Sequence, residues 1–236
     1  DATLLNGPVF GTNRPAALAA GQSLSFDGAD DYAEIIDPAT PTGYTLAAWV
    51  RFDTVRSSTI ILRTSGAGSF THWSHEIHTD ASGHFVHYTF DGASRSIVGT
   101  TVAQPGVWYH VAATATNGGP ARLYVNGVQE GSTITLGTLW TGGDRWQLGN
   151  ASPPAPNYFP GRLDQVCIFD RPLSTAQLSA LIGGASPFSW MPLQDLIRTD
   201  ARAAIAGVHS SAFVRLPFFL ASLGSFDQLT LRLPYE

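Results

Sequence analysis

The 236-residue chain contains no lysine, so all thirteen of its basic residues are arginine. Charged residues make up only 13% of the chain, and the formal net charge is −5. There is no run of basic residues, so the electrostatic footprint of a nucleic-acid-binding protein is absent. No segment reaches the ~18 consecutive apolar residues that a membrane-spanning helix needs. We therefore expect neither a nucleic-acid partner nor a membrane span.

Cysteine is almost absent as well. The single residue, Cys167, cannot form an internal disulfide and is a poor basis for a zinc site. It lies between Val166 and Ile168, which predicts a buried position. The chain begins at Asp1 without an apolar leader, so we expect that a leader was removed or that a longer polypeptide was cut.

Glycine and proline, by contrast, are plentiful, with 24 and 15 residues spread along the chain. They separate many short runs of strand character, of which 44–52 and 107–116 are the longest. Asn126-Gly127 is a strong hairpin signal, and Ser174 begins a capping-box pattern for one short helix that stops at Gly183-Gly184. The pattern predicts an all-β sandwich of two antiparallel sheets with a single short helix.

One turn has an unusual charge pattern. Asp27, Asp30 and Asp31 lie within five residues, between the short strands predicted at 24–26 and 32–36. Three carboxylates this close repel one another unless a positive charge lies among them. The turn is either a solvated acidic bend or half of a site for a hard cation such as Ca²⁺, which prefers carboxylate and carbonyl oxygens.

Seven stretches, taken in order and spacing, resemble a known family. The family is the LamG-like jelly-roll domains of the concanavalin A-like lectin/glucanase superfamily, and the resemblance covers residues 1–185. The stretches are Leu5–Pro8, Leu24–Tyr32, Tyr44–Val50, Trp108–Ala112, Leu123–Gly127, Gly161–Val166 and Phe169–Ser174.

The resemblance implies two curved sheets packed face to face, an extracellular (secreted or cell-surface) setting and binding rather than catalysis. It also implies a structural calcium ion where the first strands meet the last, with Asp27 and Asp30 facing Asp164. The sequence departs from the family at Gln165, where relatives carry Glu, so one carboxylate is missing from that site.

The composition changes after residue 185, and we expect a domain boundary between 1–185 and 186–236. The tail loosely resembles the opening of a second β-sandwich module in large secreted bacterial proteins. Half a sandwich is not stable alone, so its strands either join the first domain, pair with another chain or come from a truncated parent. The apolar residues expected to mediate self-assembly are Phe213, Leu216, Leu229, Leu231 and Leu233.

The sequence shows no enzyme motif. The catalytic relatives carry Glu-x-Asp-x-x-Glu on one strand, and the nearest carboxylate pair here, Glu34 and Asp37, has the wrong spacing. Five histidines occur close together, and we interpret them as polar residues on a solvent-facing sheet, although imidazoles could also form a transition-metal site. They are His72, His75, His78, His84 and His87.

Aromatic side chains in or beside loops are the candidates for ligand contact, because sugar rings dock on flat aromatic faces. They are Trp73, Trp140, Trp146, Tyr158 and Phe159. The favoured function is a non-catalytic extracellular adhesion module that recognises a glycan or a protein. The alternative is a structural subunit of an extracellular fibre or sheath, assembled from copies of the chain by strand complementation through the C-terminal segment.

Overall fold

The computed structural model describes residues 2–19, 21–37, 42–65, 74–150 and 157–186. The contacts of the chain divide it into two units, the first of which is Asp1–Ser189. The fold described below is that of the first unit. The predicted boundary at 185/186 stays a prediction, because the tail that follows it lies outside the described residues.

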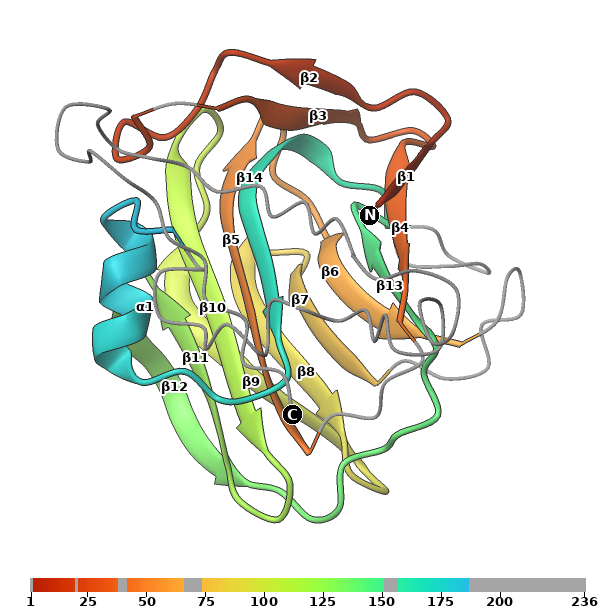
Figure 1. Cartoon of the computed structure of the whole chain (residues 1–236), viewed down its shortest axis with the longest axis vertical. Coiled ribbons are helices and arrows are strands. Elements are labelled where there is room, and N and C mark those ends of the chain that lie inside the picture. The colour runs from red at the N-terminus through yellow and green to blue at the C-terminus, as the bar shows by residue number, and fades with distance from the viewer. Residues whose placement is uncertain (1, 20, 38–41, 66–73, 151–156, 187–236) are drawn as a thin grey trace, which may run out of the picture. The chain divides into compact units, whose positions relative to one another are not determined.

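Seven antiparallel strands form the first sheet, sheet A (Figure 1). Strand β13 is inserted between β4 and β6, so that β4 and β13 are neighbours although more than a hundred residues separate them. In spatial order the strands are β1 (Thr3–Leu5), β4 (Tyr32–Ile36), β13 (Arg145–Leu148), β6 (Ser58–Thr64), β7 (His75–Thr79), β8 (His84–Phe90) and β9 (Ser94–Val102).

Seven further antiparallel strands form sheet B. Here the last strand of the domain, β14, lies between β5 and β3, so the chain ends of the domain meet in one sheet. In spatial order the strands are β12 (Val128–Thr135), β11 (Pro120–Val125), β10 (Trp108–Thr116), β5 (Gly43–Phe52), β14 (Pro160–Phe169), β3 (Ser23–Asp27) and β2 (Val9–Gly11).

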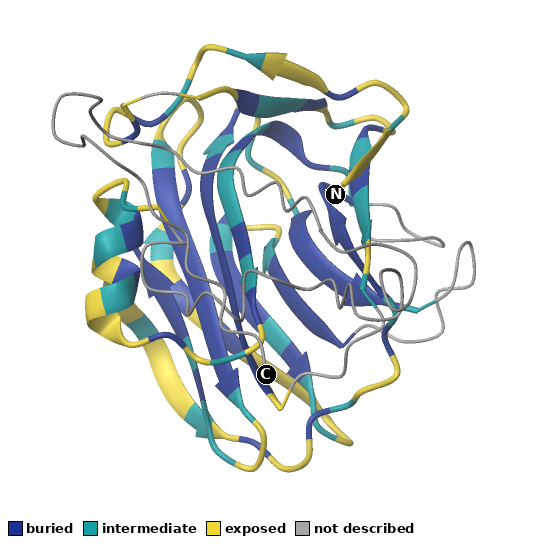
Figure 2. Cartoon of the chain, viewed as in Figure 1, coloured by how far each residue is buried: buried dark blue, intermediate teal, exposed yellow. Residues whose placement is uncertain are grey.

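The core lies between the two sheets (Figure 2). Side chains alternate across a strand, and in β5 the residues Tyr44, Leu46, Ala48, Val50 and Phe52 all point into the core. The intervening residues of β5 point to the outer face of sheet B. The alternation read from the sequence of this strand is therefore confirmed, and with it the two-layer jelly-roll sandwich.

Local sequence signals also gave the right turns and the right helix. Asn126 and Gly127 adopt φ values of 50° and 82°, as a tight hairpin between β11 and β12 requires. Helix α1 (Thr175–Ile182) begins at Ser174, whose side chain accepts a hydrogen bond from the Gln177 N–H in a capping box. In the part of the chain that the structure describes, no helix is long and apolar enough to cross a membrane.

Candidate functional site

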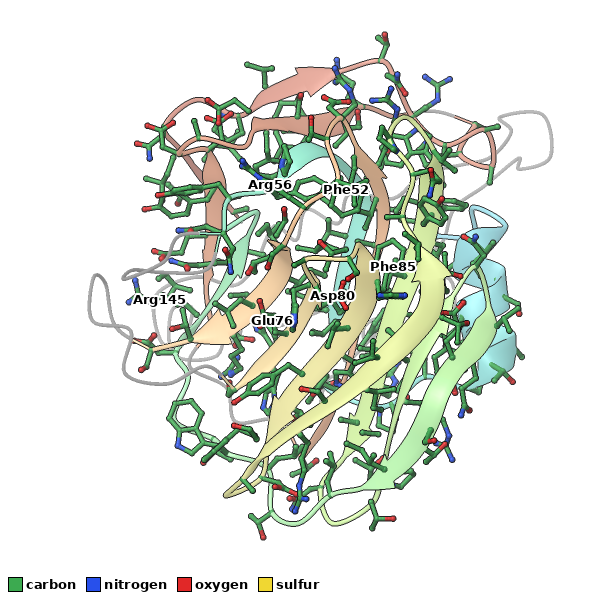
Figure 3. The ribbon with its side chains drawn as sticks, turned by 180° about the vertical axis from the view of Figure 1, so that it is seen from behind. Phe52, Arg56, Glu76, Asp80, Phe85 and Arg145 are labelled. Carbon is green, nitrogen blue, oxygen red and sulfur yellow. The ribbon has the colours of Figure 1, made fainter. Side chains whose placement is uncertain are left out.

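A row of outward-facing side chains crosses the whole of sheet A, one from each strand. The strand register places each member directly opposite the next, and core residues such as Ala33, Trp146, Leu148, Ile61 and Ile77 alternate with the members on the central strands. We call this set the polar row, and Figure 3 views the molecule from its side. Its members are Thr3, Glu34, Gln147, Leu62, Glu76, Tyr88 and Ser96.

Arg145 holds two carboxylates together at one end of the polar row. Its Nη1 donates to both oxygens of Glu34 at 3.2 Å, and its Nε donates to Asp144 Oδ1 at 3.0 Å. The hydrogen bond to Asp144, with that to Glu34, outweighs the effect of burial and raises the pKa of Arg145. The guanidinium is thus already neutralised by protein carboxylates.

Glu76 is buried near the middle of the polar row and accepts from two sides. Thr59 Oγ1 donates to one carboxylate oxygen at 2.7 Å, and His78 Nδ1 lies 3.2 Å from the other. Burial acts to lower the pKa of His78, but the hydrogen bond and charge of Glu76 prevail, and the pKa is raised. Because Glu76 stands between them, Thr59 and His78 do not form a nucleophile and base pair.

Gln147 occupies the position between Glu34 and Leu62. Its Nε2 donates to Glu34 Oε2 at 3.2 Å, and the residue is only 3% exposed. Its Oε1 is buried and has no hydrogen-bond partner in the part of the chain that the structure describes. An unpaired buried acceptor costs free energy, on the order of 1–3 kcal/mol, and such an atom in a native structure calls for an explanation such as a bound ligand or water.

The polar row opens to solvent at its far end. Tyr88 is half-buried, with its hydroxyl 3.1 Å from Ser94 Oγ, and Ser94 and Ser96 are exposed. Val98, which belongs to the next position on the outer face of β9, is 48% exposed. The exposed β9 end of the row thus differs from its middle, where Leu62, Glu76 and Gln147 are buried.

The acidic turn between β3 and β4 is held by its own carboxylates. Asp27 Oδ1 accepts from the backbone N–H of Ala29 at 2.7 Å, with longer bonds from Asp30 and Asp31, and these lower the pKa of Asp27. Asp31 Oδ2 accepts from the N–H of Asp27 at 2.9 Å, and burial raises the pKa of Asp31. One oxygen from each of the three aspartates lies within 4.8 Å of the others.

The sequence matches the family model of the concanavalin A-like lectin/glucanases superfamily over residues 27–179. That match spans well over half of the 236 residues. The protein belongs to the concanavalin A-like superfamily. The resemblance seen in the sequence is thereby confirmed, and no curated protein matches the chain.

Solved structures share the concanavalin A-like fold at low sequence identity. Domain 4 of the extracellular arabinanase AbnA from Geobacillus stearothermophilus, solved with arabinotriose, is 17% identical, with a TM-score of 0.61 over 77% of this chain and 87% of that one. The SAP-like pentraxin of Limulus polyphemus is 16% identical, with a TM-score of 0.53 over 68% and 81%. A botulinum neurotoxin type C structure, whose cell entry depends on two ganglioside molecules, is 13% identical, with a TM-score of 0.56 over 77% and 46%.

The calcium ligands that the superfamily resemblance implied are only partly brought together. Asp27 and Asp30 are adjacent, but Pro160, not Asp164, lies opposite Asp27 in the β3–β14 register. Asp164 is four residues farther along β14, about 13 Å away at the usual rise per residue, so its predicted place in the cluster is wrong. Asp31 takes that place, while the Oδ1 of Asp164 accepts from the Gln165 N–H.

Two of the predicted ligand-binding aromatics are core residues, so that part of the prediction is wrong. Trp146 is 2% exposed, with its indole N–H bonded to Asp37, and Phe159 is fully buried against the rings of Phe26 and Phe52. Trp146 lies within β13 and Phe159 immediately precedes β14, so the strands and not the neighbouring loops decide where their side chains point. Trp140 and Tyr158 are half-buried and remain candidates, whereas Trp73 lies outside the described residues.

The histidines are divided between the two faces of sheet A. His75 and His87 point into the core, so their interpretation as solvent-facing residues is wrong, whereas His78 belongs to the outer face. Tyr44 from sheet B bonds His87 Nε2 at 2.9 Å, and His75 Nδ1 bonds Thr89 at 2.9 Å. His72 lies outside the described residues, as do the predicted self-assembly residues Phe213, Leu216, Leu229, Leu231 and Leu233, whose role stays a prediction.

The polar row itself was missed from the sequence. Its members come from seven strands, and no local pattern connects Glu34 with Gln147 or Gln147 with Leu62. The signal that could have found it is the alternation within each strand combined with the family's strand order. That combination fixes which residues face outward and which strands are neighbours.

Proposed function

We propose that the chain is a non-catalytic glycan-binding module and that the ligand lies along the polar row of sheet A. The observation that carries the proposal is that Gln147 and Glu76 are buried on the outer face of the sheet, outside the hydrophobic core. Polar groups are not buried at such a place without cost, and hydroxyl-rich ligands are suited to complete the hydrogen bonds that Gln147 Oε1 lacks. The fold shared with an arabinotriose-bound domain supports this choice.

The spacing of carboxylates argues against glycoside hydrolysis. Glu34 and Glu76 are separated by three strand-to-strand steps, or about 14 Å, whereas glycosidases need roughly 5–9.5 Å between the two groups. Glu34 and Asp144 lie closer, but Arg145 occupies the space between them. A binding role therefore fits the described residues better than a catalytic one.

The proposed setting is extracellular, on a cell surface or in a matrix, where the module serves adhesion. Its partner is a glycan, and a protein ligand is the alternative partner for the same face. The superfamily match supports this setting, as does the arabinanase domain, which comes from an extracellular enzyme. The ganglioside dependence of the botulinum neurotoxin is a second case of glycan recognition within this fold.

A structural calcium ion at the acidic turn is a further part of the proposal. Asp27, Asp30 and Asp31 offer oxygens at mutual distances that one ion could bridge. The backbone N–H groups already stabilise Asp27, so the ion would chiefly offset the charges of Asp30 and Asp31. Bound there, calcium would pin the β3–β4 turn beside Pro160 of β14.

Glycan binding is tested by mapping the contact surface. The ¹⁵N-labelled chain is titrated with arabinotriose and with a panel of plant and microbial oligosaccharides, and amide shifts are followed by NMR. We expect shifts on β13, β7 and β8, with no hydrolysis product after prolonged incubation. Shifts confined to sheet B would refute the placement, and the absence of binding across a glycan array would refute the function. A protein ligand would then be sought.

A further inference from the structure

The cationic groups of the polar row are paired with protein carboxylates, whereas the buried oxygen of Gln147 is left as an acceptor for the ligand. We infer that this face selects neutral, hydroxyl-rich glycans and rejects acidic ones that carry carboxylate or sulfate groups. The inference rests on the proposed glycan-binding function and specifies the chemical class of its ligand. It follows from the hydrogen bonds and ion pairs that the polar side chains along the row already form within the protein.

The guanidinium beside the row and the Thr59 hydroxyl are directed at protein carboxylates. Arg145 donates to Glu34 and Asp144, and Thr59 donates to Glu76. An anionic ligand could take over Arg145 only by displacing Glu34 or the more exposed Asp144 from the guanidinium. That exchange brings little gain, because one charged pair is broken for each that forms.

The charges of the row add to this selection. Among the described side chains of the row and those bonded to it, Glu34, Glu76 and Asp144 are acidic, Arg145 is the guanidinium and His78 is paired with Glu76. The carboxylates outnumber the guanidinium, so a ligand carboxylate would meet net repulsion at close range. Such like-charge contacts are a common means of excluding the wrong partner.

Gln147 is the residue that distinguishes between neutral and acidic ligands by hydrogen bonding. Its amide orientation is fixed, because a carboxylate only accepts hydrogen bonds and Glu34 must therefore face the Nε2 side. The Oε1 then points away from Glu34 as an acceptor that no group among the described residues satisfies. A sugar hydroxyl can donate to it, whereas a carboxylate or sulfate oxygen cannot.

The test compares paired neutral and acidic glycans on the intact chain. A glycan array with matched members, such as galactotriose and trigalacturonic acid, is read at low ionic strength, and hits are measured by calorimetry. We expect binding among neutral members and at least about tenfold weaker binding of each acidic partner. Acidic members that bind as tightly would overturn the inference and leave the proposed function standing. Absence of binding by any member would overturn the proposed function itself.

Variants then assign the selectivity to the row. Gln147→Leu removes the unpaired acceptor, and we expect at least about tenfold loss of affinity for the neutral ligand. Gln129→Leu is the matched control, because Gln129 is an exposed glutamine on β12 of sheet B, and its affinity should be unchanged. Thermal melting of both variants shows whether they fold. If a folded Gln147→Leu chain binds the neutral glycan with unchanged affinity, Gln147 does not contact the ligand, and the inference fails.

Discussion

Two neutral histidines in the core should make the domain sensitive to acid. His75 and His87 are buried between the sheets, where Tyr44 and Thr89 supply their hydrogen bonds. Desolvation, with the charges of Arg63 and His87, lowers the pKa of His75 to about 3, and desolvation lowers that of His87 to about 4. Each folded-state value lies below that of an unfolded chain, ~6.5, so the stability contributed is complete above pH 6.5 and is lost as the pH falls.

The free energy of unfolding lost at pH 5 depends mainly on protonation of the histidines in the unfolded state. Both folded-state values lie below 5, so the histidines stay neutral in the folded chain, while the unfolded chain gains protons from pH ~6.5 downward. The 1.5 units between 6.5 and 5, at 1.36 kcal/mol per unit, give about 2 kcal/mol lost per histidine between pH 8 and pH 5.

The assay is urea unfolding followed by tryptophan fluorescence at pH 8 and pH 5. In His87→Gln, the side-chain amide can still bond Tyr44 but cannot be protonated, so the loss between the two pH values should shrink by about 2 kcal/mol. Tyr44→Phe is the matched control: it removes the hydrogen bond at both pH values, about 1 kcal/mol, and leaves the pH difference intact. An unchanged pH difference in His87→Gln would refute the reasoning.

Three other predictions test the turn, the sheet pairing and the tail. Adding Ca²⁺ should raise the melting temperature, EGTA should reverse that rise, and Asp30→Asn should abolish it. Asp27→Ala should lower the stability even without the ion, because it removes the hydrogen bonds that hold the turn. A melting temperature that neither Ca²⁺ nor EGTA changes would contradict the calcium proposal. Gly161→Ala should cost on the order of 1–3 kcal/mol in urea unfolding, because its Cβ would lie 2.1 Å from the backbone oxygen of Arg51; wild-type stability would be evidence against the β5–β14 pairing. If the chain self-associates through its tail, removing residues 225–236 should leave monomers in sedimentation velocity, and oligomers that persist would exclude strand complementation by that segment.

The elements of this fold were readable from the sequence because their signals are local. Alternation in β5, the Asn126-Gly127 turn and the Ser174 cap each depend on residues within ten positions of one another. The pairing of β14 with β3 is long-range, and it was correct only because the superfamily resemblance supplied the strand order. Local sequence patterns thus predicted the strands, turns and helix, and the family resemblance predicted the order of the strands in the sheets.

The predictions for Asp164 and Trp146 were wrong because the position of each residue within its strand decides where its side chain lies. A strand alternates its faces at every residue, and a shift along the strand of a few residues moves a side chain by about 3.3 Å per residue. Asp164 was placed beside Asp27 from sequence likeness alone, but the register carries it past the turn. Trp146 was placed at a loop, but it is the second residue of β13 and faces the core.

The acidic turn is easy to recognise in the sequence, whereas the polar row is not, because alternation distributes the members of the row over separate strands. Adjacent carboxylates are conspicuous in a sequence, yet backbone N–H groups satisfy Asp27 within its own turn, so its charge has a structural use without a ligand. Glu34, Gln147 and Glu76 are separated by dozens of residues and look ordinary, yet their row contains a buried acceptor that the described protein leaves unpaired beside the Glu34 carboxylate. Because free energy spent on burying a polar atom must be recovered, the unpaired oxygen of Gln147 is better evidence for a ligand than the density of charge at the turn.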